Sequence, residues 1–99
     1  MVQVVDDPMA MLRTKFGNML TYVQDTYKDV DVTPARALTT PAVVALVRSY
    51  FSDFRDAIVE GDMAACADGC DQEYRALVRR AADDDKLRRY LVLFIDLCA

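Results

Sequence analysis

The stretch DDDKLRRYLVLFIDLCA, residues Asp83–Ala99, decides the fold class of this chain. Its apolar part could form a buried strand by composition, since short apolar runs fit a strand and a buried helix equally well. The three aspartates at its start, however, supply an N-cap and place negative charge at the positive end of a helix. No other segment alternates between apolar and polar residues for long, so a strand here would have no partner. We therefore expect a helix over about residues 84–98 and an all-α fold.

This C-terminal helix is apolar over an unusually wide arc. At about 100° per residue, six of its side chains share a stripe about 100° wide, which is enough to contact a core. They are Leu87, Tyr90, Leu91, Phe94, Leu97 and Cys98. Leu93 and Ile95 lie to either side of the stripe, and Val92 lies nearly opposite Phe94. Because a helix this apolar is usually buried on several sides, it is either the central helix of the globule or packs partly against another molecule.

Apolar residues recur at helical spacing along the rest of the chain and predict three more main helices. We expect them over about residues 8–29, 41–60 and 62–82, with a short turn of helix at 34–38. The residues expected on their buried faces are Met9, Leu12, Phe16, Met19, Leu20, Val23, Tyr27 and Val30 in the first, Val43, Val44, Val47, Tyr50, Phe51, Phe54 and Ile58 in the second, and Met63, Cys66, Cys70, Tyr74, Leu77 and Ala81 in the third. The chain is thus predicted to form a single domain, residues 1–99, folded as a compact bundle of four main helices plus one short connecting helix.

Aspartates and glycines mark several boundaries of these helices. Asp6 or Asp7, before a proline at the first helical position, is the expected N-cap of the first helix. Gly61 is expected to end the second main helix, and Gly69 is the point at which the third could break. Gly17 lies inside the first helix, where glycine costs about 1 kcal/mol relative to alanine. We expect it to permit the close approach of another helix.

The charge and composition exclude several classes of function. The net charge is −4, which disfavours binding to nucleic acid or to an anionic membrane because both require a positive field. No apolar run approaches the ~20 residues of a membrane span. The first residues, MVQVVDDPMAML, lack the basic start and apolar core of a signal peptide. Three cysteines without framework spacing indicate a reducing compartment. We therefore expect an intracellular protein, cytoplasmic or nuclear, that is neither secreted nor membrane-bound.

The sequence contains no arrangement typical of a catalytic or metal site. It has no histidine, the commonest general base and transition-metal ligand, and no GxSxG or Gly-rich phosphate loop. Cys66 and Cys70 share a helix face and, with Cys98 and a carboxylate such as Asp71, could hold zinc or engage in disulfide chemistry. Structural zinc sites favour CxxC knuckles, however, and free cysteine is among the most buried residue types. We expect the three cysteines to fill the core, and we expect no enzymatic activity, cofactor, metal or small-molecule substrate.

Basic residues cluster between positions 71 and 89. They are Arg75, Arg79, Arg80, Lys86, Arg88 and Arg89. Acidic residues are interleaved with them, so local ion pairs on a solvated face account for most of the cluster. The alternative is a nucleic-acid-binding helical domain that uses these arginines, against which the acidic overall charge argues.

The excess apolar surface of the C-terminal helix favours a protein partner. The expected interface residues are Tyr90, Val92, Leu93, Ile95 and Leu97, with Met11 and Tyr22 from the first helix. The leading hypothesis is a small interaction module that self-associates as a homodimer, because two-fold closure is the commonest way to satisfy a self-complementary patch. The alternative is an acidic inhibitor or decoy that binds the functional surface of another protein. The composition, rich in Ala, Arg, Asp and Val, is compatible with the GC-rich genome of a large DNA virus or phage.

Overall fold

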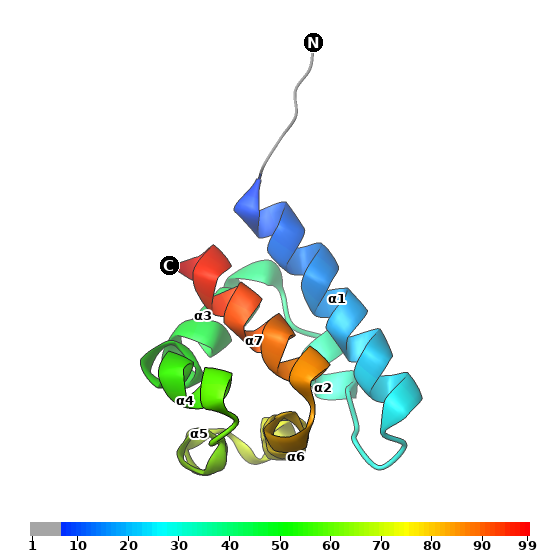
Figure 1. The fold of residues 1–99 in the computed structure, drawn as a ribbon. Coiled ribbons are helices and arrows are strands. Elements are labelled where there is room, and N and C mark those ends of the chain that lie inside the picture. Colours follow the sequence, from blue (N-terminus) through cyan, green and yellow to red (C-terminus); the bar gives the residue numbers. More distant parts are fainter. Residues whose placement is uncertain (1–6) are drawn as a thin grey trace.

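The computed structural model describes residues 7–99, with the side chains of all of them except residues 65, 72 and 73. Every regular element in this part of the chain is helical, so the all-α prediction is confirmed (Figure 1). The elements in chain order are α1 (Pro8–Thr26), α2 (Thr33–Arg36), α3 (Thr40–Tyr50), the 3₁₀ turn η1 (Ser52–Phe54), α4 (Arg55–Glu60), α5 (Ala64–Gly69), α6 (Gln72–Arg80), the 3₁₀ turn η2 (Ala81–Asp83) and α7 (Asp85–Cys98). None of the described helices is long and apolar enough to span a membrane.

α1 and α7 lie side by side and antiparallel, although they come from opposite ends of the chain (Figure 1). The rings of Phe16 and Phe94 meet between them, with centroids 5.6 Å apart. Each helix begins at an aspartate that accepts a hydrogen bond of 3.1 Å from a backbone N–H of the first turn, Asp7 for α1 and Asp84 for α7. Of the two N-caps predicted for the first helix, Asp6 lies outside the described residues.

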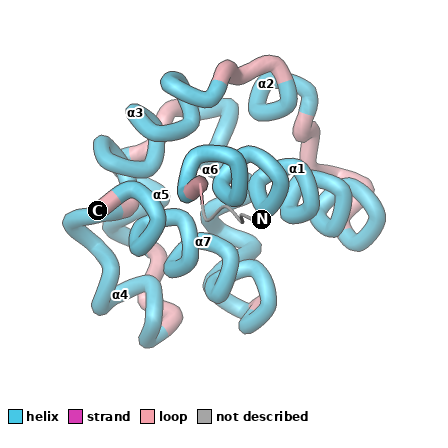
Figure 2. The backbone as a smooth tube through the Cα atoms, turned by 90° about the horizontal axis from the view of Figure 1, so that it is seen from above, coloured by secondary structure: helices cyan, strands magenta, loops and turns pink. Residues whose placement is uncertain are grey.

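α7 is buried on several sides because α1, α3 and α4 all pack against it. Figure 2 shows α2 and α3 along one side of the molecule, with α4 and α7 toward the other. The most deeply buried large side chains are Phe94, Leu12, Met19, Leu20, Ile58, Leu87, Leu91, Val23, Val43, Val47, Val78 and Cys66. Among the described elements none covers the remaining, outward side of α7. Of the two explanations for its wide apolar arc, the central position therefore accounts for only part of its circumference.

The helix predicted over 41–60 is divided, so the count of four main helices is wrong. α3 ends at Tyr50, and the 3₁₀ turn η1 redirects the chain into α4. The hydroxyl of Ser52 donates to the carbonyl of Val47, five residues earlier, at 3.4 Å, so it adds a side-chain donor at the end of α3. The N–H of Phe54 donates to the carbonyl of Phe51 at 3.0 Å, which closes the tighter turn. The change of direction lays α4 against α7.

The helix predicted over 62–82 is also divided, at the place where Gly69 allowed a break. α5 ends at Gly69, and Cys70 is extended, with ψ 152°. The guanidinium of Arg75 donates to the carbonyls of Ala67 and Cys70, both at 3.2 Å. The Ala67 carbonyl also accepts from the N–H of Cys70, so Arg75 adds a second donor there and supplies one to the carbonyl of Cys70. With both divisions, the described chain forms seven α-helices, several of them short.

Three smaller expectations are also corrected. The first helix ends at Thr26 rather than near residue 29, because Tyr27 is extended and its hydroxyl is held by Asp84. Met9, expected on the buried face, is exposed at the start of α1. Gly17 makes no close helix contact, since a Cβ built on it would meet nothing within 4 Å.

Candidate interaction surface on α7

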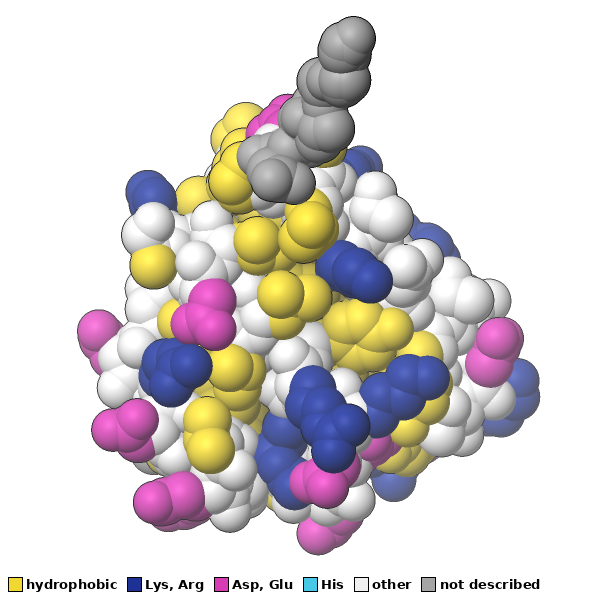
Figure 3. Space-filling model, turned by 45° about the horizontal axis from the view of Figure 1, so that its top comes forward, with side chains coloured by type: hydrophobic (Ala, Val, Ile, Leu, Met, Phe, Trp, Pro, Cys, Tyr) yellow, Lys and Arg dark blue, Asp and Glu magenta, His cyan; other side chains and the backbone are white. Residues whose placement is uncertain are grey.

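The side chains that α7 turns away from the core form a surface of mixed character, which we call the outer α7 surface. It consists of Arg89, Val92, Leu93 and Asp96 on α7, with Val59 of α4 beside them. A groove of about 530 Å³ runs between the two helices along these residues. Val59 is 53% exposed, so its apolar side chain contributes to the free surface of this groove. Figure 3 shows hydrophobic side chains continuing across this face, with Lys and Arg side chains gathered beside them.

Leu93 lies on a ridge between two hollows. The groove toward α4 is on one side, and a smaller hollow of about 170 Å³ toward α1 is on the other, lined also by Lys15, Lys86 and Tyr90. Val92 packs partly against the buried core, whereas Leu93 is half-buried without joining the described side chains packed there. Leu93 is therefore the α7 side chain whose apolar surface contributes least to the fold of a single chain.

The charges of this surface are only partly paired. Arg88 forms an ion pair with Asp85 and donates to the carbonyls of Ala81 and Ala82, so it ties α7 to the preceding turn. Asp96 accepts from Arg55 of α4 at 3.2 Å, and both side chains remain largely exposed. In the described part of the chain Arg89 has neither a hydrogen bond nor an ion pair, although its side chain is exposed on this surface.

Two of the predicted interface residues have intrachain roles instead. Ile95 is only 6% exposed, so it belongs to the core and its assignment to the interface was wrong. The reason is that α7 is flanked by α1, α3 and α4, which together bury a wider arc than a single neighbour would. Tyr22 is half-buried, and its hydroxyl donates to Asp84 at 2.7 Å. Of the other predicted residues, Tyr90 and Leu97 are half-buried, and Met11 is 43% exposed.

Tyr22 and Tyr27 together fasten the end of α1 to the beginning of α7. Both hydroxyls donate to the same oxygen of Asp84, at 2.7 and 2.5 Å. These hydrogen bonds, with burial, raise the pKa of both tyrosines, that of Tyr27 to about 12. Burial alone would raise the pKa of Asp84, but the two hydroxyls and the N–H groups that it caps outweigh burial and lower it. The ammonium of Lys86 lies 4.6 Å from the centroid of the Tyr22 ring.

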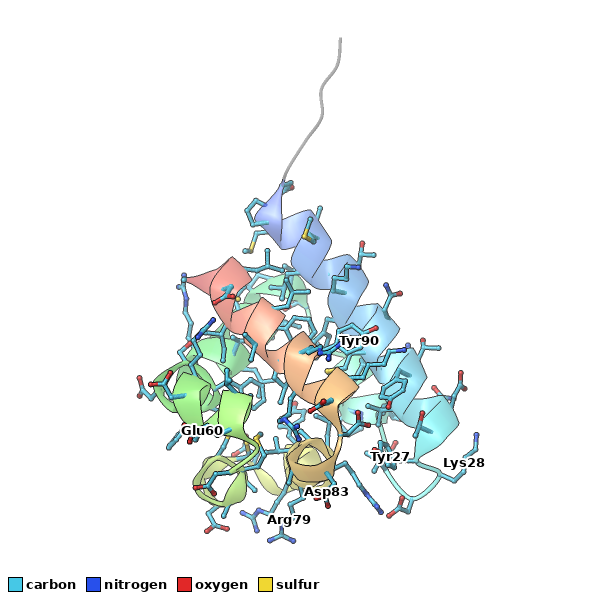
Figure 4. All side chains as sticks on the ribbon, in the orientation of Figure 1. Tyr27, Lys28, Glu60, Arg79, Asp83 and Tyr90 are labelled. Atoms are coloured by element: carbon cyan, nitrogen blue, oxygen red, sulfur yellow. The ribbon has the colours of Figure 1, made fainter. Side chains whose placement is uncertain are left out.

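The basic cluster is dispersed by the fold. Arg75 and Arg88 bind backbone carbonyls, and Arg80 pairs with Asp29 and lies over the Tyr27 ring. Arg79 and Arg89 are exposed, and within the described residues neither has an ion pair. Figure 4 shows Arg79 beside Asp83 at the end of the molecule remote from Tyr90, so the two arginines do not form one patch.

The three cysteines are buried and unpaired, as expected for core residues. The thiol of Cys66 donates to the carbonyl of Tyr50 at 3.1 Å. Its interaction with Cys70 and its burial raise the pKa of the Cys66 thiol, which keeps it protonated. Among the described side chains, no group of three or more Cys, Asp or Glu is placed to hold a metal ion.

Val59 is the surface residue that sequence reasoning missed. It follows Ile58, the last member of the apolar stripe of its helix, and a single apolar residue next to a stripe is an ordinary feature of a sequence. Only the bend at η1, which turns α4 alongside α7, brings it next to Val92 and Leu93.

No family model matches this chain, and the comparisons find neither a curated protein nor a solved structure that is similar to it.

Proposed function

We propose that this chain is a small helical protein–protein interaction module that self-associates through the outer α7 surface. The observation that carries the proposal is the position of Leu93, a large apolar side chain left half-buried between two hollows and beside the exposed Val59. Contiguous apolar surface with a polar rim is typical of protein-binding sites. The rim here is supplied by Arg89, Asp96 and Lys86.

A partner of the same kind suits this surface because it carries both signs of charge in close proximity. An acidic inhibitor or decoy, the alternative, would be expected to present acidic side chains to a basic partner. The outer α7 surface instead carries one basic and one acidic side chain. Arg89 has no acidic partner among the described residues, and Asp96 forms an ion pair with Arg55 alone. The nucleic-acid alternative has less support, because three of the five arginines of the basic cluster are engaged within the chain.

The test is light scattering behind size exclusion, over about a hundredfold range of protein concentration. The wild-type chain is expected to give the mass of a dimer. Leu93→Asp is expected to weaken association by about a hundredfold or more, since two-fold symmetry would bury two unpaired carboxylates. Circular dichroism should show Leu93→Asp folded, because Leu93 contributes little to the core.

The matched control is Ala45→Asp, which makes the same change of charge at an exposed position of α3. It is expected to leave the dimer intact. A wild-type mass of one chain at every concentration would contradict self-association and leave this surface to a different protein. An unfolded Leu93→Asp chain would place Leu93 in the core and remove the observation on which the proposal rests.

A further inference from the structure

The spacing of charge along α7 is symmetric about the midpoint between Val92 and Leu93. Arg89 precedes that midpoint by three and a half residues and Asp96 follows it by three and a half, or about 5 Å of helix on either side at 1.5 Å per residue. Positions seven apart are two turns apart and lie on nearly the same line of the helix. The outward side of α7 therefore reads basic, apolar, apolar, acidic from its N-terminal to its C-terminal half.

Building on the self-association proposed above, we propose that two copies pair their α7 helices antiparallel, about a two-fold axis that passes between Val92 and Leu93. In this arrangement Arg89 of each copy lies level with Asp96 of the other, so two intermolecular ion pairs form. Val92 of each copy lies level with Leu93 of the other and covers it. A parallel pairing would instead place Arg89 of one copy against Arg89 of the other, and Asp96 against Asp96. Repulsion between these like charges opposes it.

The two charged groups are available for these contacts. Arg89 is exposed and has no ion pair among the described residues, so its guanidinium is free to reach another chain. The side chain of Asp96 is 56% exposed despite its contact with Arg55. A carboxylate has lone pairs enough to accept from two guanidinium groups, so Asp96 would lie between Arg55 of its own chain and Arg89 of the second copy.

The same symmetry brings identical flanks of the two α7 helices together. Val59 lies on the α4 side of the outer α7 surface, and the smaller hollow lies on the α1 side. Arg55, one turn before Val59 in α4, contacts Asp96, so Val59 lies roughly level with the middle of α7. With the two α7 helices antiparallel, the two-fold axis places the α4 side of one copy opposite the α4 side of the other, so Val59 of each copy lies across the axis from Val59 of the other. The exposed apolar side chain of each copy thus covers that of the other, where the grooves between α4 and α7 face one another.

The experiment is a charge-reversal series on the full chain, measured by sedimentation. Arg89→Glu and Asp96→Arg are each expected to weaken the dimer by about tenfold or more, because each places two like-charged pairs across the axis. An equimolar mixture of the two variants is expected to associate as tightly as the wild type, because Glu at position 89 then meets Arg at position 96 and the original pair forms at the other site. The double variant is expected to dimerise for the same reason. Arg79→Glu, which makes the same change of charge at the end of the molecule remote from Tyr90, is the matched control.

The outcomes separate this pairing from the self-association on which it rests. A wild-type chain that stays monomeric overturns both. A wild-type dimer that Leu93→Asp dissociates, but that tolerates both reversals, leaves self-association standing and overturns the antiparallel pairing. The antiparallel pairing is also overturned if both charge-reversal variants weaken the dimer but their equimolar mixture does not regain the affinity of the wild type. If Asp96→Arg is unfolded because Arg55 loses its partner, Arg89→Ala replaces it in the series and must still weaken the dimer by several-fold.

Discussion

At the scale of single residues, two glycines show how far local sequence can be interpreted. Gly61 adopts φ +84° at the end of α4, and its N–H donates to the carbonyl of Ile58 at 3.1 Å. This role could be predicted, because a left-handed C-cap depends on the sequence next to it. The surroundings of Gly17 could not, because they depend on which segment packs nearby, and in this fold the space beside it is open.

Gly17→Ala is expected to stabilise the chain by up to about 1 kcal/mol. Alanine restricts the unfolded chain and favours the helix interior, and the added methyl group meets no atom within 4 Å. Urea denaturation followed by circular dichroism measures the free energy of unfolding. Gly61→Ala is the matched control and should be destabilising, since its backbone is left-handed. A loss of stability in Gly17→Ala would show that the side of α1 near this residue is more crowded than the fold indicates.

The hydrogen bond between Tyr27 and Asp84 makes stability depend on pH. Folding raises the pKa of Tyr27 from its ordinary value near 10 to about 12. The stabilisation is therefore complete below about pH 10 and is lost as pH rises toward about 12. The pKa of Asp84 is lowered, so its contribution is present above the ordinary aspartate value and is lost as pH falls below it.

Tyr27→Phe is expected to reduce the loss of stability between about pH 10 and about pH 12, because it removes the group whose pKa is raised. The measurement is the free energy of unfolding of both proteins across that range. Deprotonation of lysines affects both proteins alike, so the difference between them isolates Tyr27. Parallel curves for the two proteins would mean that the hydroxyl does not hold its proton through Asp84.

At the scale of elements, the positions of helices were largely predictable and their continuity was not. Apolar periodicity and caps are local, so they identified the helical segments and an aspartate N-cap for α7, which is Asp84. The division of the predicted second helix depends on Ser52 and Phe51, whose contacts favour a bend only once α4 can pack on α7. The division at Cys70 depends likewise on Arg75, a residue that sequence reasoning placed in a solvated cluster.

Arg75→Met is expected to destabilise the chain by about 1–3 kcal/mol. The methionine keeps an apolar stem but removes both guanidinium hydrogen bonds, so the carbonyl of Cys70 loses this donor and that of Ala67 keeps only the N–H of Cys70. Arg79→Met, an exposed arginine on the same helix, should change stability by less than about 0.5 kcal/mol. Equal effects of the two substitutions, measured by urea denaturation, would show that Arg75 does not hold the junction of α5 and α6.

At the scale of the whole molecule, the candidate surface was predictable as a helix but not in its residues. The width of the apolar arc drew attention to α7, and Val92 and Leu93 lie on its outward side. Which of the flanking side chains are covered depends on neighbours, and packing places Ile95 inside. Val59 joins the surface only through the bend before α4. The proposed pairing of Arg89 with Asp96 could be inferred only from the fold, in which Arg89 has no ion pair among the described residues.

The side-by-side position of α1 and α7 has a consequence for the order in which the chain can fold. A ribosome releases α1 first, but the helix that covers its apolar face, with Phe94 against Phe16, emerges only after the five other helices. Contacts between such distant segments form late, because a long loop has to close before they are made. Until residues 85–98 have emerged, Leu12, Phe16 and their neighbours remain accessible to chaperones or to other nascent chains. A termination codon within residues 85–98 would therefore leave an unfolded, aggregation-prone product rather than a slightly shorter native protein.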